Sequence, residues 1–565
     1  MTVPSRGDGF PGPASDLFPP MPFLSPPPRR WPLALLGLFL AALVVFGIGI
    51  QEPTGLTGKD EYFLGLRTPM EMMEKDAWVV PVLNDQPRLK KPPMLYWLGR
   101  ASFEVFGPSL PAARGITVLF AALLVVATAA LGRRLTGSAG AGLWAAVLLF
   151  TVMGLASESR RFMLDVPTAA LSTLAFLGLV RWKDERRAGD LVLAAVLLAA
   201  GFLLKGPIVA VVCGAGVLGL LLSGQWAWAD LWRRKFSLAG ALGLFLALAL
   251  PWFIYVRLRY PEAAAAELQE ELEARQLFTP SPETLLGALQ IVLPWSFVLL
   301  ALVWRLRREP GPARMLLVWA GFTVLPFCFI HTFDRYLVGS LVPFALILGF
   351  ALARGERFPA WALRLGAGLV LLMAGVFAAF AFWFHLGGWG WLLPPLALLL
   401  WAAWRADPRA MAAAMALVWL AFFGLLFPRL GINAVPDAVR ALAADRPVLM
   451  FDGPQPAMLP ILLGHPLRHT STLDARDLAP PRLLIFVRAE DEARLREQAR
   501  ALGADLRTLG DYPVLASRGS GIRFTRDGAG KAQWLDAIRS RSLAPLESTV
   551  RYLEVQAPTG REGRP

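Results

Sequence analysis

The 565-residue sequence is poor in charge, cysteine and histidine. Only 17% of its residues are charged and 56% are hydrophobic, whereas charged residues make up roughly a quarter of a soluble domain. The two cysteines, Cys213 and Cys328, lie inside apolar segments, which argues against a disulfide framework or a thiolate metal site. The four histidines form no metal-binding cluster in the sequence. These deficits indicate a chain whose surface faces lipid.

The net charge of +14 would suggest nucleic acid as a partner of a soluble protein. Here the arginines stand in short connections between apolar segments, where they act as signals of membrane topology. Tryptophan (20) and phenylalanine (35) outnumber tyrosine (7), as expected for helices with interfacial anchors. We therefore predict a membrane protein that does not bind nucleic acid.

Apolar segments long enough to cross a bilayer recur along the chain, which has a mean hydropathy of +0.51. We predict about thirteen transmembrane helices, at residues 31–50, 113–132, 139–156, 165–182, 190–204, 206–223, 237–257, 285–305, 314–331, 336–353, 361–384, 388–404 and 409–428. Every second connection is basic, which places all basic connections on one side. This pattern predicts a cytoplasmic N-terminus in the bacterial inner membrane.

The ends of the chain differ from its middle. Residues 1–30 are proline-rich and predicted to be disordered in the cytoplasm, and residues 31–429 form the predicted membrane domain. Residues 430–565 have the composition of a soluble protein, with strands expected at 447–451 and 482–487 and a helix at 491–502. The fold class is therefore a polytopic α-helical membrane protein with a small periplasmic α/β domain.

The first outer loop, residues 51–112, is too long for a simple connector. It contains Asp60 and Glu61, a turn with Lys91, and two segments, 66–75 and 94–106, that we expect to be interfacial helices. In the second of these segments we expect the aromatic face to lie in lipid. Taken alone, the loop is equally well explained as structure without chemistry.

Other polar residues on the outer side are also ambiguous when taken singly. Asp165 is explained as a helix N-cap, and most of the charges of 260–280 as a solvated helix face. Arg160 and Arg161 break the charge pattern and need a local reason, such as a carboxylate or a bound phosphate. Lys205, at a break between two spans, is costly at that depth without a partner.

Together, Asp60, Lys91, Asp165, Lys205 and Arg335 are predicted to lie on one outer face near the bilayer boundary. Several cations with two acids suit a membrane-embedded lipid phosphate. A proton-coupled transporter would more often show mid-helix acids and internal repeats, and neither is clear in this sequence.

These motifs resemble the bacterial protein O-mannosyltransferase-like members of the GT-C superfamily, and most closely the type that transfers aminoarabinose to lipid A. The resemblance covers roughly residues 31–355. It is carried by Asp60-Glu61, the stretch from Trp78 to Trp97 with Lys91-Pro92-Pro93, Asp165, Lys205-Gly206-Pro207, Leu250-Pro251-Trp252 and Arg335-Tyr336-Leu337. It implies thirteen helices, a long first periplasmic loop and a periplasmic C-terminal domain.

Two positions depart from the family pattern. Lys90 stands where the family usually has Glu, and the segment from Glu270 to Gln276 lacks the usual His. These departures put a family metal site in doubt, so no cofactor is assigned and a weakly bound divalent cation stays open.

The resemblance implies a glycosyltransferase that takes a sugar from a polyprenyl (undecaprenyl) phosphate. Departure of the phosphate needs cations, which Lys91, Lys205, Arg335 and Arg161 can supply, with Arg160 as a further candidate. We predict Asp60 as the base that activates the acceptor, with Asp165 orienting it. Glu61 stays open as the alternative base, because the spacing to Trp78 is one residue longer than expected.

Tyr96 and Tyr336 are predicted to position the substrate. Displacement from one face should invert the anomeric centre. Lipid A, another glycolipid or a protein hydroxyl are open as acceptors, and we expect a monomer. The alternatives are a lipid-linked sugar flippase or transporter, and a non-catalytic membrane scaffold.

Overall fold

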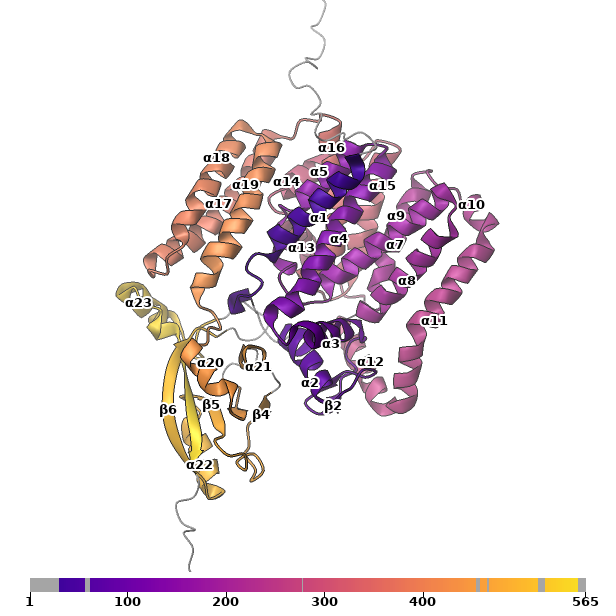
Figure 1. Cartoon of the computed structure of the whole chain (residues 1–565). Helices are drawn as coiled ribbons and strands as arrows, with labels where there is room; N and C mark the ends of the chain where they lie inside the picture. The colour runs from indigo at the N-terminus through magenta and orange to yellow at the C-terminus, as the bar shows by residue number, and fades with distance from the viewer. Residues whose placement is uncertain are drawn as a thin grey trace, which may run out of the picture.

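The computed structural model describes residues 30–55, 61–276, 278–453, 458–464, 467–516 and 524–556. A large bundle of helices forms the body, and a smaller part with a β-sheet lies at one end of it (Figure 1). The predicted disordered N-terminal segment lies outside the described residues, except for Arg30.

Each of the thirteen predicted apolar segments is helical. Seven of them are single helices: α1 (Trp31–Gly47), α4 (Leu110–Thr136), α7 (Asp165–Glu185), α8 (Ala188–Lys205), α9 (Ile208–Leu222), α11 (Lys235–Arg259) and α17 (Ala360–Trp383). The other six are composite: α5 (Ala139–Leu149) with α6 (Met153–Glu158), α13 (Glu283–Ile291) with α14 (Ser296–Leu306), α15 (Pro312–Val324) with η5 (Leu325–Phe329), η6 (Asp334–Ser340) with α16 (Leu341–Ala353), η7 (Trp389–Leu392) with α18 (Leu393–Arg405), and α19 (Pro408–Ala421) with η8 (Phe422–Leu426) and η9 (Phe427–Leu430).

Among the described residues, seven helical segments are both long and apolar enough to cross a membrane. The pair α13 and α14 is bent by 109° and is an eighth candidate, and α1, α5 and α9 are shorter apolar helices. The chain is thus a multi-pass membrane protein. The count of thirteen spans stays a prediction.

Small residues allow the helices of the bundle to approach closely. A Cβ atom added to Gly142 in α5 would lie 2.1 Å from the carbonyl oxygen of Ala129 in α4, so only glycine fits there. Gly206, with φ of +70°, ends α8 and turns the chain into α9 at the predicted Lys-Gly-Pro break. This turn leaves Lys205 at the end of α8.

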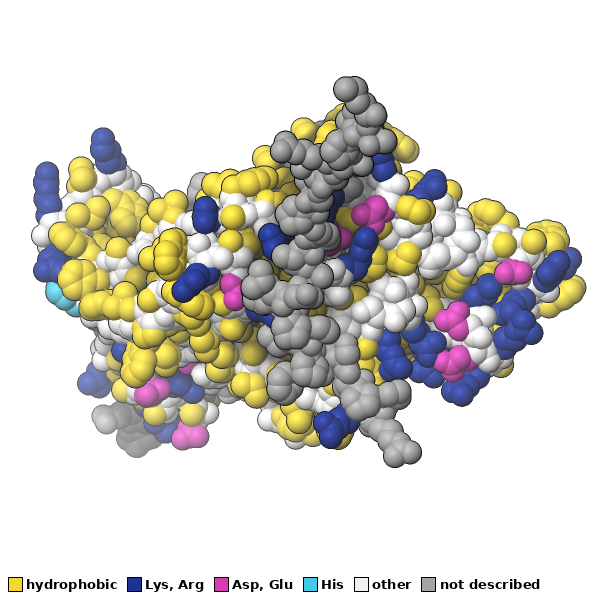
Figure 2. Space-filling model, turned by 90° about the horizontal axis from the view of Figure 1, so that it is seen from above, with side chains coloured by type: hydrophobic (Ala, Val, Ile, Leu, Met, Phe, Trp, Pro, Cys, Tyr) yellow, Lys and Arg dark blue, Asp and Glu magenta, His cyan; other side chains and the backbone are white. Residues whose placement is uncertain are grey.

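Several short elements gather at the end of the bundle that also carries the β-sheet (Figure 1). They are the π-helical turn η4 (Glu61–Arg67), α2 (Thr68–Glu74), the hairpin of β1 (Val82–Leu83) and β2 (Gln86–Pro87), α3 (Met94–Phe106) and α12 (Pro261–Arg275). The view onto the opposite end shows more Lys and Arg than Asp and Glu side chains (Figure 2). The first loop and the C-terminal part therefore share one end, as the sequence predicts.

The two helices expected in the first loop exist, but the expectation of an aromatic face in lipid is wrong for most of the second one. Tyr96 and Phe103 of α3 are buried, and Phe103 packs in one hydrophobic cluster with Leu66 and Met70. Phe106 alone of these aromatic residues is largely exposed. Packing of α2 against α3 covers the apolar faces that we expected to enter the bilayer.

The C-terminal part contains a five-stranded sheet within its described residues, with the order β4-β3-β5-β7-β6. The strands are β3 (Val448–Phe451), β4 (Arg468–Thr470), β5 (Leu484–Arg488), β6 (Asp505–Val514) and β7 (Ser548–Gln556). Strands β4, β3 and β5 are parallel, and β7 pairs antiparallel with β5 and β6. The accompanying helices are α20 (Asp437–Ala444), α21 (Met458–Leu463), α22 (Glu492–Ala501), α23 (Lys531–Ser540) and η10 (Ala544–Leu546). The two strands and the helix predicted here are confirmed.

Candidate functional site

The centre of the candidate site is an ion pair between Asp165 and Lys205. Helix α7 begins at Asp165 and α8 ends at Lys205, so the antiparallel pair of helices brings both residues to the same end. The Lys205 ammonium donates to the Asp165 carboxylate, and both side chains are buried. Asp165 is the first residue of α7 and its carboxylate binds Lys205, so the simple N-cap interpretation is wrong.

Arg335 and Tyr336 of η6 complete this cluster. Arg335 Nε lies 3.8 Å from Asp165 Oδ2, and Lys205 Nζ lies 3.7 Å from the centroid of the Tyr336 ring. The aromatic face stabilises the ammonium charge. Lys205 and Arg335 thus place two cations beside one carboxylate.

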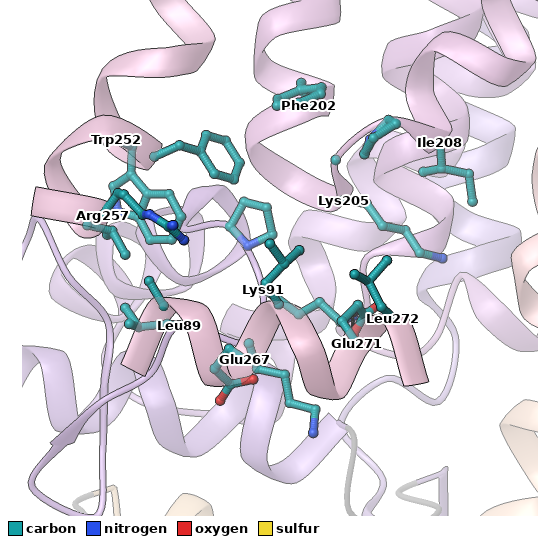
Figure 3. Close-up of a pocket in the computed structure, with 18 of the residues that line it drawn as sticks. Leu89, Lys91, Phe202, Lys205, Ile208, Trp252, Arg257, Glu267, Glu271 and Leu272 are labelled. Atoms are coloured by element: carbon teal, nitrogen blue, oxygen red, sulfur yellow. Dashed lines mark hydrogen bonds and ion pairs between the residues drawn. The ribbon is translucent and has the colours of Figure 1, made fainter. Parts of the chain in front are cut away.

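A cavity of about 920 Å³ opens beside this cluster. Lys205 and Tyr336 line it together with Lys91, Glu271 and Arg257. Most of its wall is apolar and comes from α8, α9, α11, α12 and η5: Phe202, Ile208, Val211, Trp252, Phe253, Leu268 and Phe327. Figure 3 shows Lys205 and Trp252 on opposite sides, with Lys91 between them. The cavity suits a ligand with an apolar body and an anionic group.

Lys91 lies at the wall made by α12. Its ammonium is 2.9 Å from both carboxylate oxygens of Glu271, and the neighbouring Lys90 pairs with Glu270. The interpretation of the α12 charges as mostly solvated holds for Glu270, which is 60% exposed, whereas Glu271 is less exposed and lines the cavity. They hold α12 against the loop that precedes α3.

Glu61 is fully buried in a bidentate ion pair with Arg114 of α4. The distances are 2.8 Å from Arg114 Nε to Oε1 and 3.2 Å from Nη2 to Oε2, and the backbone N–H of Phe162 donates to Oε1 at 2.9 Å. Glu61 thus connects the first loop to α4 and to the segment before α7. Asp60, the predicted base, lies outside the described residues.

The two arginines of the second outer loop have partners within the protein. Arg161 Nη1 lies 3.1 Å from a carboxylate oxygen of Glu158. Arg160 donates to the backbone carbonyls of Ile48, Val45 and Ala156. Both arginines therefore have the local reason that the sequence analysis requires, which is a carboxylate for Arg161 and backbone carbonyl oxygens for Arg160.

Tyr96 lies away from the cavity wall. Its hydroxyl accepts a hydrogen bond from Arg88 Nε at 3.2 Å, and its ring packs with Met72 and Met163. Burial raises the pKa of the Tyr96 hydroxyl, and the nearby Arg88 opposes this effect. In the described structure Tyr96 supports the first loop, whereas Tyr336 lines the cavity.

In the part of the chain that the structure describes, no three His, Cys, Asp or Glu side chains come together as a metal-binding group. Glu271, an acid that lines the cavity, is instead paired with Lys91. A divalent cation at this wall would have to compete with an ammonium group.

Three residues of the site region were not selected from the sequence for their own roles. Glu271 pairs with Lys91, Glu158 pairs with Arg161, and Trp252 Nε1 donates to the backbone carbonyl of Val79 at 2.9 Å, which ties α11 to the first loop. The paired lysines at 90–91 and paired glutamates at 270–271 are a signal, but one that does not specify contact. A surface helix whose charges all face water would have the same residues at these positions.

Comparisons with known proteins agree with this architecture. Residues 66–265 match the dolichyl-phosphate-mannose-protein mannosyltransferase family. The fold matches the crystal structure of ArnT from Cupriavidus metallidurans bound to undecaprenyl phosphate, with a TM-score of 0.66, 19% identity and coverage of 93% of this chain and 98% of that one. An undecaprenyl phosphate-alpha-4-amino-4-deoxy-L-arabinose arabinosyl transferase of Pseudomonas paraeruginosa is 29% identical over 69% of this chain and 74% of its own length.

Coverage is lower for other relatives. The chain spans about half the length of the first curated relatives it matches, with 52% and 48% of two Aquifex aeolicus proteins and 58% of an arabinosyl transferase of Pseudomonas fluorescens.

Residues 66–265 thus match a protein mannosyltransferase family domain, which lies within a multi-pass membrane protein. The fold of the chain is similar to that of ArnT. The predicted resemblance is thereby confirmed.

Proposed function

We propose that this chain is an integral membrane glycosyltransferase that takes a sugar from a polyprenyl phosphate donor. The observation that carries the proposal is the paired Asp165 and Lys205 at the polar end of a cavity with apolar walls. A prenyl chain suits the walls, and a phosphate suits the cations Lys205 and Arg335 at the polar end. The matched ArnT structure contains undecaprenyl phosphate, which supports the same ligand class.

In the proposed reaction the phosphate leaves with the bond electrons of the glycosidic C–O bond. Lys205 and Arg335 stabilise the charge that develops on it, and Lys91 joins them when it exchanges Glu271 for the phosphate. Arg161 is the fourth proposed phosphate ligand, although in this structure it pairs with Glu158. A polyprenyl phosphate is a good leaving group, so no strong general acid is required.

The acceptor hydroxyl or phosphate attacks the anomeric carbon from the opposite face, which inverts that centre. Asp60 is proposed as the base that removes or orients the acceptor proton, and this assignment rests on the sequence alone. The carboxylate of the neighbouring Glu61 already accepts hydrogen bonds from the Arg114 guanidinium and the backbone N–H of Phe162. These hydrogen bonds favour Asp60 over Glu61 as the base.

The acceptor is proposed to be lipid A or another glycolipid that faces the periplasm. The arabinosyl transferases among the relatives support an amino sugar as the transferred group. We further propose an inner-membrane location, with residues 1–30 in the cytoplasm and residues 430–565 as a periplasmic domain that shapes acceptor access. Reporter fusions after Arg187 and Ala434 should report cytoplasm and periplasm, and the same side for both would contradict this topology.

A lipid-linked sugar flippase or transporter is the alternative interpretation of the sequence. The matched family and the named relatives are transferases, so the comparisons favour sugar transfer. Mass spectrometry of lipids from a deletion strain tests the proposal. Polyprenyl phosphate carrying one sugar should accumulate while one glycosylated lipid loses that sugar, and unchanged masses of both would contradict it.

A further inference from the structure

Helix α23 of the C-terminal part is fixed to the end of a candidate transmembrane helix. Trp383, the last residue of α17, donates from its indole Nε1 to the Ile538 carbonyl at 2.9 Å. Arg541 donates back to the Trp383 carbonyl at 3.3 Å, and its guanidinium lies 4.8 Å from the centroid of the Trp383 ring. Because α17 is apolar along 24 residues, its end marks the height of the bilayer boundary.

The neighbourhood of α23 has the composition of a membrane interface. Trp383 ends α17, and the connection from there to α18 contains Trp389 and Trp391, of which Trp391 is 62% exposed. Tryptophan is enriched at the boundary between lipid and water. In Figure 1, α23 lies next to the end of this helix pair, above the strands of the sheet.

Two apolar faces run along α23. Trp534 and Ala537, three residues apart, pack in a cluster with Phe384 and Leu430 from the ends of the membrane helices. Leu535 and Ile538, also three residues apart, are 41% and 44% exposed. One face is therefore occupied by the protein and the other is open.

Basic residues stand beside the open face. Lys531 begins α23 and falls on the same side as Ile538 by helical periodicity, and Arg539 lies next to Leu535. Lysine and arginine can place their stems along apolar surface and their charges at phosphate groups. An apolar face bordered by cations fits the headgroup region of a bilayer with anionic lipids.

We propose that α23 is an interfacial helix that inserts Leu535 and Ile538 into the leaflet beside α17. The partner is the lipid surface, with the headgroup phosphates next to Lys531 and Arg539. This contact fixes the C-terminal part against the membrane, at the end of the bundle that contains the cavity. The inference does not depend on the proposed function.

Site-directed spin labelling of the full chain in nanodiscs with phosphatidylglycerol tests this. Both cysteines are first replaced by alanine, and single cysteines are introduced as Leu535→Cys and Ile538→Cys. Val376→Cys on the exposed face of α17 is the lipid control, and Leu502→Cys after α22 is the water control, since both side chains are exposed. Collisions of each label with oxygen and with a water-soluble nickel chelate are compared.

The labels at 535 and 538 should favour oxygen over the chelate, as the label at 376 does, and the label at 502 should favour the chelate. Two positions keep the test valid if one variant folds poorly. Chelate access at both positions equal to that at 502 would overturn the proposal. Protection from both reagents would also overturn it, because a protein partner would then cover the face.

Discussion

Glu61 and Arg114 form an ion pair in which both side chains are almost fully buried, with relative exposures of 0% and 1%. The pair joins the first loop to α4, 53 residues away along the chain. Removing the charge of Glu61 leaves a buried guanidinium without its counter-ion, which typically costs about 3–5 kcal/mol. We therefore predict that Glu61→Gln lowers the thermal unfolding midpoint of the purified protein.

Asp437→Asn is the matched control for this loss of stability. Asp437 forms an ion pair with Arg440 on the surface, where such pairs contribute about 0–1 kcal/mol. Its midpoint should stay close to that of the wild type. Equal midpoints for Glu61→Gln and Asp437→Asn would show that the buried pair has no special role.

Asp60→Asn should reduce turnover and leave stability unchanged. The substitution keeps the shape and removes the negative charge, and general base catalysis is typically worth about 10²–10⁴ in rate. Binding of undecaprenyl phosphate and membrane insertion should persist. The turnover of Glu61→Gln, normalised to the amount of folded enzyme, is the control. If Asp60→Asn turns over at the wild-type rate, Asp60 is not the base.

Lys205→Met should weaken binding of undecaprenyl phosphate, even without a sugar. A hydrogen bond to a charged group contributes about 1.5–3 kcal/mol, or roughly ten- to hundredfold in Kd. Lys183→Met is the control, because Lys183 also pairs with an aspartate, Asp230, but does not line the cavity. Tyr336→Phe should bind nearly as well as the wild type, since it keeps the ring under the ammonium. Unchanged affinity of Lys205→Met would place the phosphate elsewhere.

Glu271→Gln should bind undecaprenyl phosphate more tightly than the wild type. Glu271 competes with the phosphate for Lys91, and a partly exposed pair suggests a gain of roughly two- to fivefold. Glu270→Gln, which affects only the more exposed pair with Lys90, should change the affinity less. Titration of both variants in detergent measures this, and weaker binding of Glu271→Gln would show that the phosphate does not use Lys91.

Much of the fold could be predicted from the sequence, because lipid imposes a simple rule on it. Apolar segments must be helical to satisfy their backbone groups, and each predicted segment is helical. The strands β3 and β5 and the helix α22 follow from ordinary periodicity. The burial of Tyr96 could not be predicted from the sequence, because hydrophobic periodicity identifies an apolar face of a helix but not the surface that covers it.

The candidate site was predictable in part. Lys205 and Asp165 were placed on one face by topology, and their direct contact agrees with the cost of an unpaired charge near lipid. The pairing of Lys91 with Glu271 joins residues 180 positions apart, and no local pattern specifies such a contact. The sequence therefore identified Lys205 together with its acid, Asp165, but not Glu271 as the acid that pairs with Lys91.

The most direct test of the account uses lipids extracted from a deletion strain, which should contain both the sugar donor and the unmodified acceptor. The extract is incubated in detergent with purified wild-type protein or with Lys205→Met, and all lipid masses are followed. Detergent removes the membrane barrier, so a flippase would change nothing. With wild-type protein we predict that the donor declines, polyprenyl phosphate rises and one acceptor gains the sugar mass, whereas Lys205→Met leaves the extract nearly unchanged. No change in any of these masses with folded wild-type protein would contradict the proposed glycosyl transfer.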